Sequence, residues 1–198
     1  MSGDASRTAA DCVIRVALEE RRKAWRHADK ATAIVEALAN DCITSLRQAG
    51  QVVFCGNGGS AAMAEHLAAE LVGRYAADNR PPLSARALSC NSATMTALGN
   101  DFGFETVFAR QVEGVCHAGD VLVALSTSGC SPSVVAALEV ARRRGCITAL
   151  LTGNHTAAGR PAVNHLVEAP ATITAVVQEL HLFHGHLLCE LIEQAFLT

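Results

Sequence analysis

The sequence predicts an α/β fold, a three-layer α/β/α sandwich built on a five-stranded parallel sheet. Short apolar runs rich in Val, Leu and Ile alternate with segments of helical periodicity, as is typical of strands that helices cover on both faces. The chain has 198 residues, and half of them are hydrophobic, which is enough for one sizeable core. We therefore expect a single domain over residues 1–198, with helices at 9–49 and the sandwich at 50–198. The predicted strands are residues 51–55, 85–90, 120–125, 146–152 and 164–168.

Charge, hydropathy and cysteine spacing exclude several classes of protein. The formal net charge is −3 and no basic run is longer than 142–144, so a nucleic-acid-binding surface is not indicated. No stretch approaches 18 consecutive apolar residues and the N-terminus is polar, so we expect neither a membrane span nor a signal peptide. None of the eight cysteines forms a C-x-x-C pair, which argues against a cysteine zinc site. These features predict a cytoplasmic protein with reduced thiols.

Residues 9–49 have the apolar spacing of helices, with side chains such as Ile34 and Leu38 recurring at three- and four-residue steps. The stretch 27–30 predicts a bend between two helices, and Gly50 is typical of a helix stop. Such a segment is not part of the sheet's own core. We therefore expect it to cover a face of the sheet or to contact another subunit.

The most informative stretch begins at the first predicted strand. Three glycines follow that strand, at Gly56, Gly58 and Gly59, and Ser60 stands where a helix should start, as a capping residue. The first turn of a helix offers unpaired N–H groups and the positive end of its dipole. A strand, a glycine turn and a helix start therefore predict an anion site, most often one for phosphate.

The middle of the chain supplies the remaining elements. A polar loop with two prolines occupies 76–84 and precedes the second strand. The periodic segments predict helices at about 92–99, 105–116, 132–144 and 174–196, with a break in the pattern at 99–104.

A second polar turn follows the third predicted strand. It carries four hydroxyls, from Ser126, Thr127, Ser128 and Ser131, just before Pro132 at the first helical position. A simple capped turn would need Ser131 alone, so the cluster favours phosphate binding. Neutral donors suit a phosphate ester that is held rather than transferred. Since ligands of parallel sheets bind at the carboxyl ends of the strands, both turns should lie at that edge.

Two nucleotide-binding interpretations are weaker. The sequence has no G-x-x-x-x-G-K-[ST] motif, which excludes ATP or GTP hydrolysis of the P-loop type. The first turn matches G-x-G-x-x-A through Gly56, Gly58 and Ala61. A dinucleotide site also needs an acidic residue at the end of the second strand, and residues 89–91 contain none.

Two helices carry side chains suited to acid–base or metal chemistry. His66 and Glu70 are four residues apart, so they share one helix face. The C-terminal helix carries Gln178, three histidines and a further glutamate within residues 178–186. A packed histidine and a solvated glutamate are the simpler interpretation of any one pair, and we expect His181 and His184 at the surface. Together the helices could supply either a metal site or a facing base and acid.

These motifs in combination resemble the sugar isomerase (SIS) domain family, and within it the sedoheptulose 7-phosphate isomerases. The resemblance covers about residues 10–197. The matching segments are Cys55–Ser60, His66 with Glu70 and Gly73-Arg74, Gly99–Gly103, Ser126–Gly129 with Ser131, Leu151–Gly153, and Gln178-Glu179 with His181 and His186.

The resemblance implies a fold, an assembly and a set of roles. It implies an α/β/α sandwich, a homotetramer that the N-terminal helices help to build, and a sugar-phosphate substrate. It implies Glu70 as the base and His186 as the acid of an aldose–ketose isomerisation through an enediol. It also implies zinc as a probable cofactor, with His66, Glu70, Gln178 and His186 as ligands. The substrate-binding residues that it implies are Asn57, Gly58, Gly59, Ser60, Glu70, Arg74, Asn100, Asp101, Ser126, Thr127, Ser128, Ser131 and Gln178.

One departure from the family pattern affects the substrate site. The segment before Gln178 usually carries a charge in the family, and here it is the uncharged Ala175-Val176-Val177. The departure bears on contacts between that segment and the sugar hydroxyls.

Two alternatives stay open beside the isomerase. One is a non-catalytic SIS-domain protein that binds a sugar phosphate or a protein such as a replication initiator, and the other is an isomerase of a different ketose phosphate.

Overall fold

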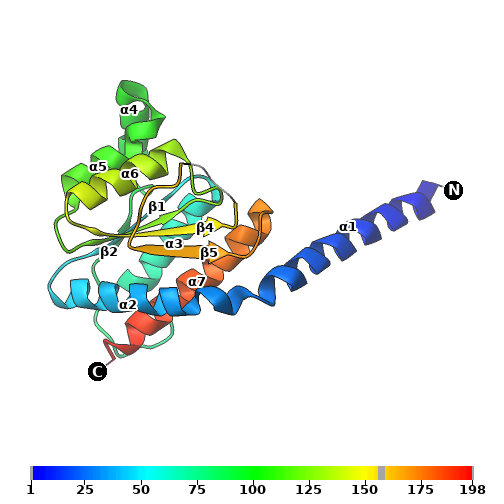
Figure 1. Ribbon diagram of the computed structural model, residues 1–198, viewed down its shortest axis with the longest axis horizontal. Helices are drawn as coiled ribbons and strands as arrows, with labels where there is room; N and C mark the ends of the chain where they lie inside the picture. The colour runs from blue at the N-terminus through cyan, green and yellow to red at the C-terminus, as the bar shows by residue number, and fades with distance from the viewer. Residues whose placement is uncertain (1, 156–158, 198) are drawn as a thin grey trace.

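The computed structural model describes residues 2–155 and 159–197, and its centre is a parallel sheet of five strands in the order β2-β1-β3-β4-β5 (Figure 1). The predicted fold class is confirmed. The strands are β1 (Val52–Gly56), β2 (Ala85–Ala87), β3 (Val121–Leu125), β4 (Ile147–Gly153) and β5 (His165–Ala169). The helices are α1 (Ser2–Trp25), η1 (Ala28–Ala31), α2 (Thr32–Arg47), α3 (Gly59–Val72), α4 (Ser92–Phe102), η2 (Phe104–Thr106), α5 (Val107–Val115), α6 (Pro132–Arg143) and α7 (Thr174–Gln194).

Helices cover both faces of the sheet. Alternate strand residues point to opposite faces, so Phe54 packs with α2, α3 and α7, while Val53 packs with α5 and α6 (Figure 1). The central strands β1, β3 and β4 are buried along nearly their whole length. This two-sided burial explains their continuous apolar sequences, which single-sided strands would not show.

The register of β1 and β3 positions the two predicted turns. These strands are neighbours, and Gly56 at the end of β1 pairs with Leu125 at the end of β3. The glycine turn after β1 and the hydroxyl turn after β3 therefore leave the sheet side by side. Their predicted position at the carboxyl edge is confirmed.

The N-terminal helices divide at the predicted bend, where η1 separates α1 from α2. Val35, Leu38 and Cys42 of α2 are buried against the sheet side of the core, so this helix does cover a face. In contrast, α1 projects away from the body of the protein (Figure 1). Its large apolar side chains are exposed, and Val13 reaches 69%.

Two predicted boundaries were wrong. The helix expected at 92–99 continues to Phe102 and ends only at Gly103, whose φ of +85° favours glycine. Gly99 is therefore an ordinary helical residue here, since a glycine inside a helix is unfavourable but tolerated. The second strand is also shorter than expected and spans only Ala85–Ala87.

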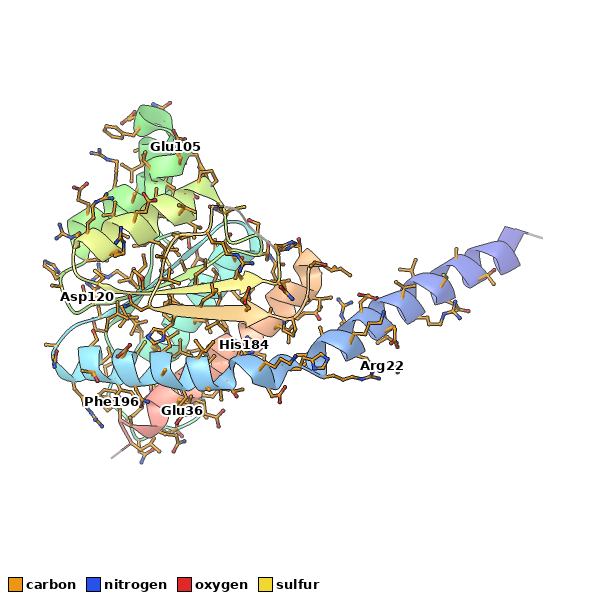
Figure 2. The ribbon with its side chains drawn as sticks, viewed as in Figure 1. Arg22, Glu36, Glu105, Asp120, His184 and Phe196 are labelled. Carbon is orange, nitrogen blue, oxygen red and sulfur yellow. The ribbon has the colours of Figure 1, made fainter. Side chains whose placement is uncertain are left out.

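The predicted surface position of His181 and His184 was also wrong. Their side chains are 0% and 1% exposed, because they share with Leu180 the face of α7 that turns inward. Nε2 of His184 donates to the carbonyl oxygen of Ala28, 3.1 Å away, beside the turn from α1 into α2 (Figure 2). Burial lowers the pKa of both imidazoles, that of His181 to about 4. The backbone of Thr152, which approaches the His181 ring without good hydrogen-bond geometry, partly opposes this shift.

No helix in the described ranges is long and apolar enough to cross a membrane. All eight cysteines lie in those ranges and carry unpaired thiols, five of them buried. Burial raises the pKa of the Cys55 thiol to about 12, which keeps it protonated and unreactive at neutral pH.

The burial of His181 predicts an acid-dependent loss of stability. The folded-state pKa of about 4 lies below the unfolded value of about 6.5, so between these pH values the unfolded chain binds more protons. The contribution of the neutral, buried His181 imidazole to the free energy of unfolding is therefore complete above pH 6.5 and is lost as the pH falls towards 4. When the pH is lowered from 7.5 to 5, the free energy of unfolding measured in urea should fall by about 2 kcal/mol less in His181→Leu than in the parent chain. His27→Gln, at an exposed position, is the control, and equal losses in His181→Leu and parent would contradict the prediction.

Candidate active site

A pocket of about 250 Å³ lies where the turns after β1 and β3 meet. Every residue that lines it is uncharged, so a bound anion would be held by hydroxyls, amides and the dipoles of α3 and α6. The lining residues are Asn57, Ser60, Leu125, Ser126, Thr127, Ser128, Ser131, Thr174 and Gln178. The pocket thus brings together the predicted hydroxyl cluster, Asn57, Ser60 and Gln178.

Glycine geometry lets the turn after β1 close over this pocket. A Cβ on Gly56 would lie 2.8 Å from the Cβ of Ser60 and 2.9 Å from the carbonyl oxygen of Leu125, so only glycine fits. Gly58 has a φ of +55° and is the N-cap of α3. The prediction that Ser60 caps the helix was therefore wrong. Ser60 is the second residue of α3, is 4% exposed, and presents its side chain to the pocket instead.

Asn57 ties the two turns together. Its Nδ2 donates to the hydroxyl oxygens of Ser131, at 2.8 Å, and Ser133, at 2.9 Å. Ser131 is the N-cap of α6 as predicted, but its hydroxyl accepts the hydrogen bond from Asn57 and makes no capping hydrogen bond to the helix. The Oδ1 of Asn57 is buried and has no hydrogen-bond partner among the described residues, so an acceptor is left for a ligand hydroxyl.

A second cluster joins α3 to α7 further along these helices. Nε2 of His66 lies 2.8 Å from Nε2 of His186 and 3.4 Å from Oε1 of Glu70. The rings of His66 and His186 meet edge to face at 5.1 Å, and the ring of Tyr75 lies 5.7 Å from that of His186. The structure therefore brings the carboxylate and both imidazoles of the predicted site together from two distant segments.

A close helix contact makes this cluster possible. A Cβ on Gly185 would lie 2.6 Å from Cδ1 of Leu67, so α7 approaches α3 more closely here than any other residue would allow. Leu67 follows His66 and Gly185 precedes His186 in the sequence. The close contact between the helices therefore brings the two imidazoles together.

Gln178 marks the other end of the same helix pair. Its side chain lies against Gly59, where a Cβ would come within 2.8 Å of Nε2. Gly59 meets Gln178 and His66 meets His186, so α3 and α7 run parallel and side by side. Gln178 thus lies at the anion pocket, about 12 Å along α7 from His186.

The residues predicted as zinc ligands are only partly assembled. His66, Glu70 and His186 converge, and Gln178 lies in the anion pocket. Within the described ranges, no three His, Cys, Asp or Glu side chains have the arrangement of a metal site. The 2.8 Å between the imidazole nitrogens is a hydrogen-bond distance, whereas two ligands of one zinc ion lie about 3.3 Å apart. The donor atoms suit zinc, but the rings would have to separate by about half an ångström.

Three predicted substrate-binding residues lie away from the pocket. Arg74 is exposed and forms an ion pair with Asp78. Asn100 and Asp101 are exposed on α4, which protrudes from the α5–α6 layer, and Nδ2 of Asn100 donates to Asp101 at 2.8 Å (Figure 1). Their roles in binding remain predictions.

Sequence reasoning missed three residues beside the site. Tyr75 contacts His186, Thr174 lines the anion pocket, and Arg160 lies 3.0 Å from where a Cβ of Gly129 would stand. Nε of Arg160 is buried without a partner among the described residues, behind the hydroxyl turn. Tyr75 follows the helix of Glu70 and is the only tyrosine, which was a usable signal. Nothing local in the sequence connects Arg160 to the turn.

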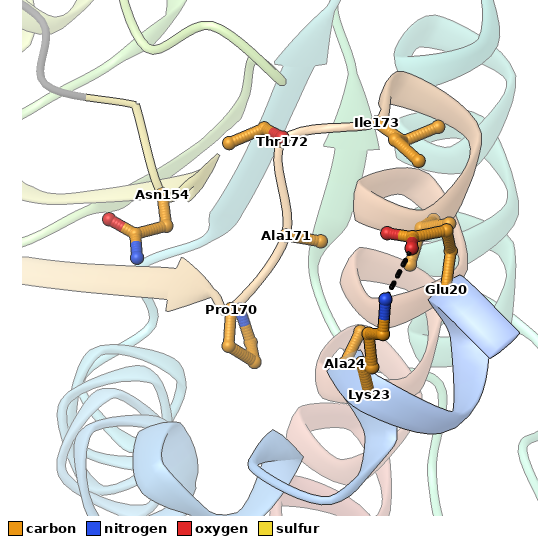
Figure 3. Close-up of a pocket in the computed structure, with 9 residues that line it drawn as sticks. Glu20, Lys23, Ala24, Asn154, Pro170, Ala171, Thr172 and Ile173 are labelled. Carbon is orange, nitrogen blue, oxygen red and sulfur yellow. Dashed lines mark hydrogen bonds and ion pairs between the residues drawn. The ribbon is translucent and has the colours of Figure 1, made fainter.

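A separate pocket of about 260 Å³ lies between α1 and the carboxyl ends of β4 and β5 (Figure 3). Asn154 and Pro170 line one side, and the Lys23–Glu20 ion pair of 2.9 Å lines the other. None of the predicted site residues lines this pocket.

Comparison with known proteins finds one family and many relatives. The SIS domain model matches residues 18–153. A phosphoheptose isomerase of Rhodospirillum rubrum is 48% identical over 188 residues, covering 95% of this chain and 93% of the relative. A phosphoheptose isomerase of Akkermansia muciniphila is 48% identical over 160 residues, covering 81% of this chain and 84% of the relative.

Solved structures agree with these relatives. The phosphoheptose isomerase GmhA from Neisseria gonorrhoeae matches with a TM-score of 0.83 and 35% identity, covering 92% of this chain and 99% of that chain. A phosphoheptose isomerase from Francisella tularensis matches with a TM-score of 0.87 and 33% identity, covering 93% and 98%. The likeness extends over the sheet and its covering helices.

The contact at Gly185 predicts a marked effect of one methyl group. Gly185→Ala should lower the free energy of unfolding by about 1–3 kcal/mol, because the new Cβ overlaps the buried Leu67 side chain. Gly114→Ala is the matched control, since Gly114 lies in α5 with open space around its Cβ position. The control should be neutral or stabilising by up to about 1 kcal/mol. Equal free energies of unfolding for Gly185→Ala and the parent chain in urea would contradict the prediction, because α7 could then move away from α3 without loss of stability.

Proposed function

The chain belongs to the SIS domain family, and from this premise we propose that it is an aldose–ketose isomerase of sedoheptulose 7-phosphate. The product would be D-glycero-D-manno-heptose 7-phosphate. One observation carries the proposal. A neutral anion pocket and a carboxylate–imidazole cluster lie at two ends of the same pair of parallel helices. Two relatives that are 48% identical, over 81% and 95% of this chain, are named phosphoheptose isomerases.

The separation of the two ends supports a long sugar phosphate. From Gly59, beside the anion pocket, to His66 in the cluster, the rise along α3 is about 10 Å. An extended seven-carbon chain measures about 10 Å from C1 to a phosphorus on C7, at roughly 1.2 Å per bond. A phosphate in the pocket would therefore place C1 and C2 beside Glu70 and His186. A shorter ketose phosphate would reach the cluster less fully.

The anion pocket would hold the phosphate rather than react with it. Ser60, Ser126, Thr127, Ser128 and Ser131 offer hydroxyl donors, and the first turns of α3 and α6 offer amides. Asn57, through its free Oδ1, would accept a sugar hydroxyl. Binding of this kind fixes the substrate's position along the helices and leaves its other end to the chemistry.

Isomerisation requires one proton to move between C1 and C2 through an enediol. We assign Glu70 as the base that removes the proton from C1 and returns it to C2, and His186 as the acid that protonates the oxygen on C2 and then accepts the proton from the oxygen on C1. Within the 2.8 Å contact, one imidazole must donate and the other accept. His66, which also faces Glu70 at 3.4 Å, would thus orient the ring of His186.

Zinc is a proposed cofactor of this cluster. His66, Glu70 and His186 supply nitrogen and oxygen donors of the kind that zinc binds, and Gln178 would complete the set by turning from the anion pocket. When bound, zinc would polarise the substrate's carbonyl and hydroxyl oxygens as a Lewis acid. The proton transfers assigned above are made by the side chains.

The exposed apolar side chains of α1 support a homotetramer. Val13, Ile14, Val16 and Leu18 are each about half exposed or more, on a helix that projects from the body (Figure 2). A stripe of this kind favours burial against another chain. We propose a cytoplasmic homotetramer assembled through α1, with no nucleic-acid or membrane partner.

Glu70→Gln tests the assigned base. We expect the rate of aldose formation from sedoheptulose 7-phosphate to fall by about 10²–10⁴-fold, because the amide cannot accept the proton. Glu65→Gln is the matched control, since Glu65 is exposed on the same helix and should keep parental activity. Light scattering should give the mass of four chains for all three proteins. Full activity of Glu70→Gln would remove the assignment, and faster turnover of fructose 6-phosphate by the parent chain would favour a shorter substrate.

Zinc binding can be measured without activity. After dialysis against zinc and gel filtration, the parent chain should retain about one ion per chain, and His66→Ala should retain far less because one donor is lost. His117→Ala, at an exposed histidine outside the cluster, should match the parent. Equal zinc content in all three proteins would contradict the proposed ligand set.

A further inference from the structure

A buried ion pair joins the loop after α3 to the C-terminal part of α7. Nε of Arg80 lies 2.9 Å from Oε1 of Glu193, and each side chain is only 1% exposed. Burying two charges is costly unless their hydrogen bonds are also satisfied. Both side chains meet that condition, and their hydrogen-bond partners are backbone groups of one segment, the end of α3 and the loop that follows it.

Glu193 accepts hydrogen bonds from the backbone of the loop. Its carboxylate accepts from the amides of Tyr75 at 3.1 Å, Ala76 at 2.9 Å and Ala77 at 3.0 Å. Burial alone would raise the pKa of Glu193, but these amides and Arg80 hold it below the ordinary range. The carboxylate is thus charged in the folded protein, and it fixes the chain where it leaves α3.

Arg80 holds the end of α3 itself. Its guanidinium donates to the carbonyl oxygens of Glu70 at 2.5 Å, Leu71 at 2.8 Å and Pro81 at 3.0 Å. The carbonyls of Glu70 and Leu71 belong to the last turn of the helix, where no intrahelical partner exists. Arg80 therefore closes the C-terminus of the helix at the residue that we assign as the base.

The pair also lies on the face of α7 that carries the acid. Glu193 follows His186 by two helical turns, so both side chains lie on one face. Glu193 holds the amide of Tyr75, whose ring lies 5.7 Å from the His186 ring. A single polar cluster thus links the backbone of Glu70, the ring of Tyr75 and the helix of His186.

We propose that Arg80 and Glu193 are positioning residues for catalysis, which set Glu70, Tyr75 and His186 relative to one another. This inference rests on the proposed isomerase function. The pair would not touch the substrate and would act through the backbone of Glu70 and Tyr75, which it binds, and through α7, which carries His186. A role in stability alone would not require this arrangement, because apolar residues of similar volume often replace a buried ion pair without loss.

The test uses Arg80→Lys, which keeps the charge but loses the forked contacts, and Glu193→Gln, which keeps the shape but loses the charge. In folded variants we expect kcat to fall about ten- to a hundredfold, because small misplacements of catalytic groups cause losses of this size. KM should stay within about threefold of the parent value, because the anion pocket lies at the opposite end of α3. Asp41→Asn is the control, since it breaks the 2.7 Å pair with His165 between α2 and β5, outside the site.

A spectroscopic signal separates positioning from stability. Tyr75 is the only tyrosine, so labelling with 3-fluorotyrosine gives one fluorine resonance that reports the ring beside His186. We expect this resonance to shift or broaden in Arg80→Lys and Glu193→Gln and to stay unchanged in Asp41→Asn.

The outcomes are distinguishable. An unchanged kcat and an unchanged fluorine resonance in either folded variant would overturn the positioning role, and so would a KM effect without a kcat effect. A parent chain that does not isomerise sedoheptulose 7-phosphate would overturn the proposed function. The fluorine experiment would still show whether the pair places Tyr75.

Discussion

The site depends on how closely α7 approaches α3. At Gly185 the backbone of α7 meets the side chain of Leu67 with no room for a Cβ, and this places His186 against His66. A larger residue would separate the helices and with them the carboxylate and imidazoles to which we assign the chemistry. The adjacency of β1 and β3 has the same importance for the anion pocket, because it sets the two turns side by side.

The two ends of this helix pair have different physical characters. Around the anion pocket the lining is neutral, so a phosphate would be bound by dipoles and hydroxyls that do not compete for its protons. Around the cluster the side chains are ionisable, and His66 lies 2.8 Å from His186 and 3.4 Å from Glu70. Beyond the cluster, Arg80 and Glu193 fix the end of α3. Holding the substrate and moving its proton are thus assigned to separate groups about 10 Å apart.

The sequence predicted what depends on local pattern and missed what depends on distant contacts. The strands, the glycine turn and the hydroxyl turn were predictable because burial on both faces and turn chemistry leave signals in neighbouring residues. His181 and His184 were misplaced because α7 is apolar on most of its circumference, so periodicity could not identify its inward face. Ser60 was taken for a cap because the glycine that fills that role has no side-chain signal. The Arg80–Glu193 pair joins residues 113 positions apart, and nothing local marks it.

Two predicted binding residues provide an argument about assembly. Asn100 and Asp101 lie on α4, which protrudes from the layer of α5 and α6 and contributes nothing to the described lining of the anion pocket (Figure 1). They can contact a substrate in only two ways: α4 would have to move as a unit, or a second chain would have to present its pocket to α4. Moving α4 would require the chain to change conformation where the helix ends, at Gly103. The second way requires no rearrangement within the chain, and it agrees with the homotetramer proposed from the exposed apolar side chains of α1.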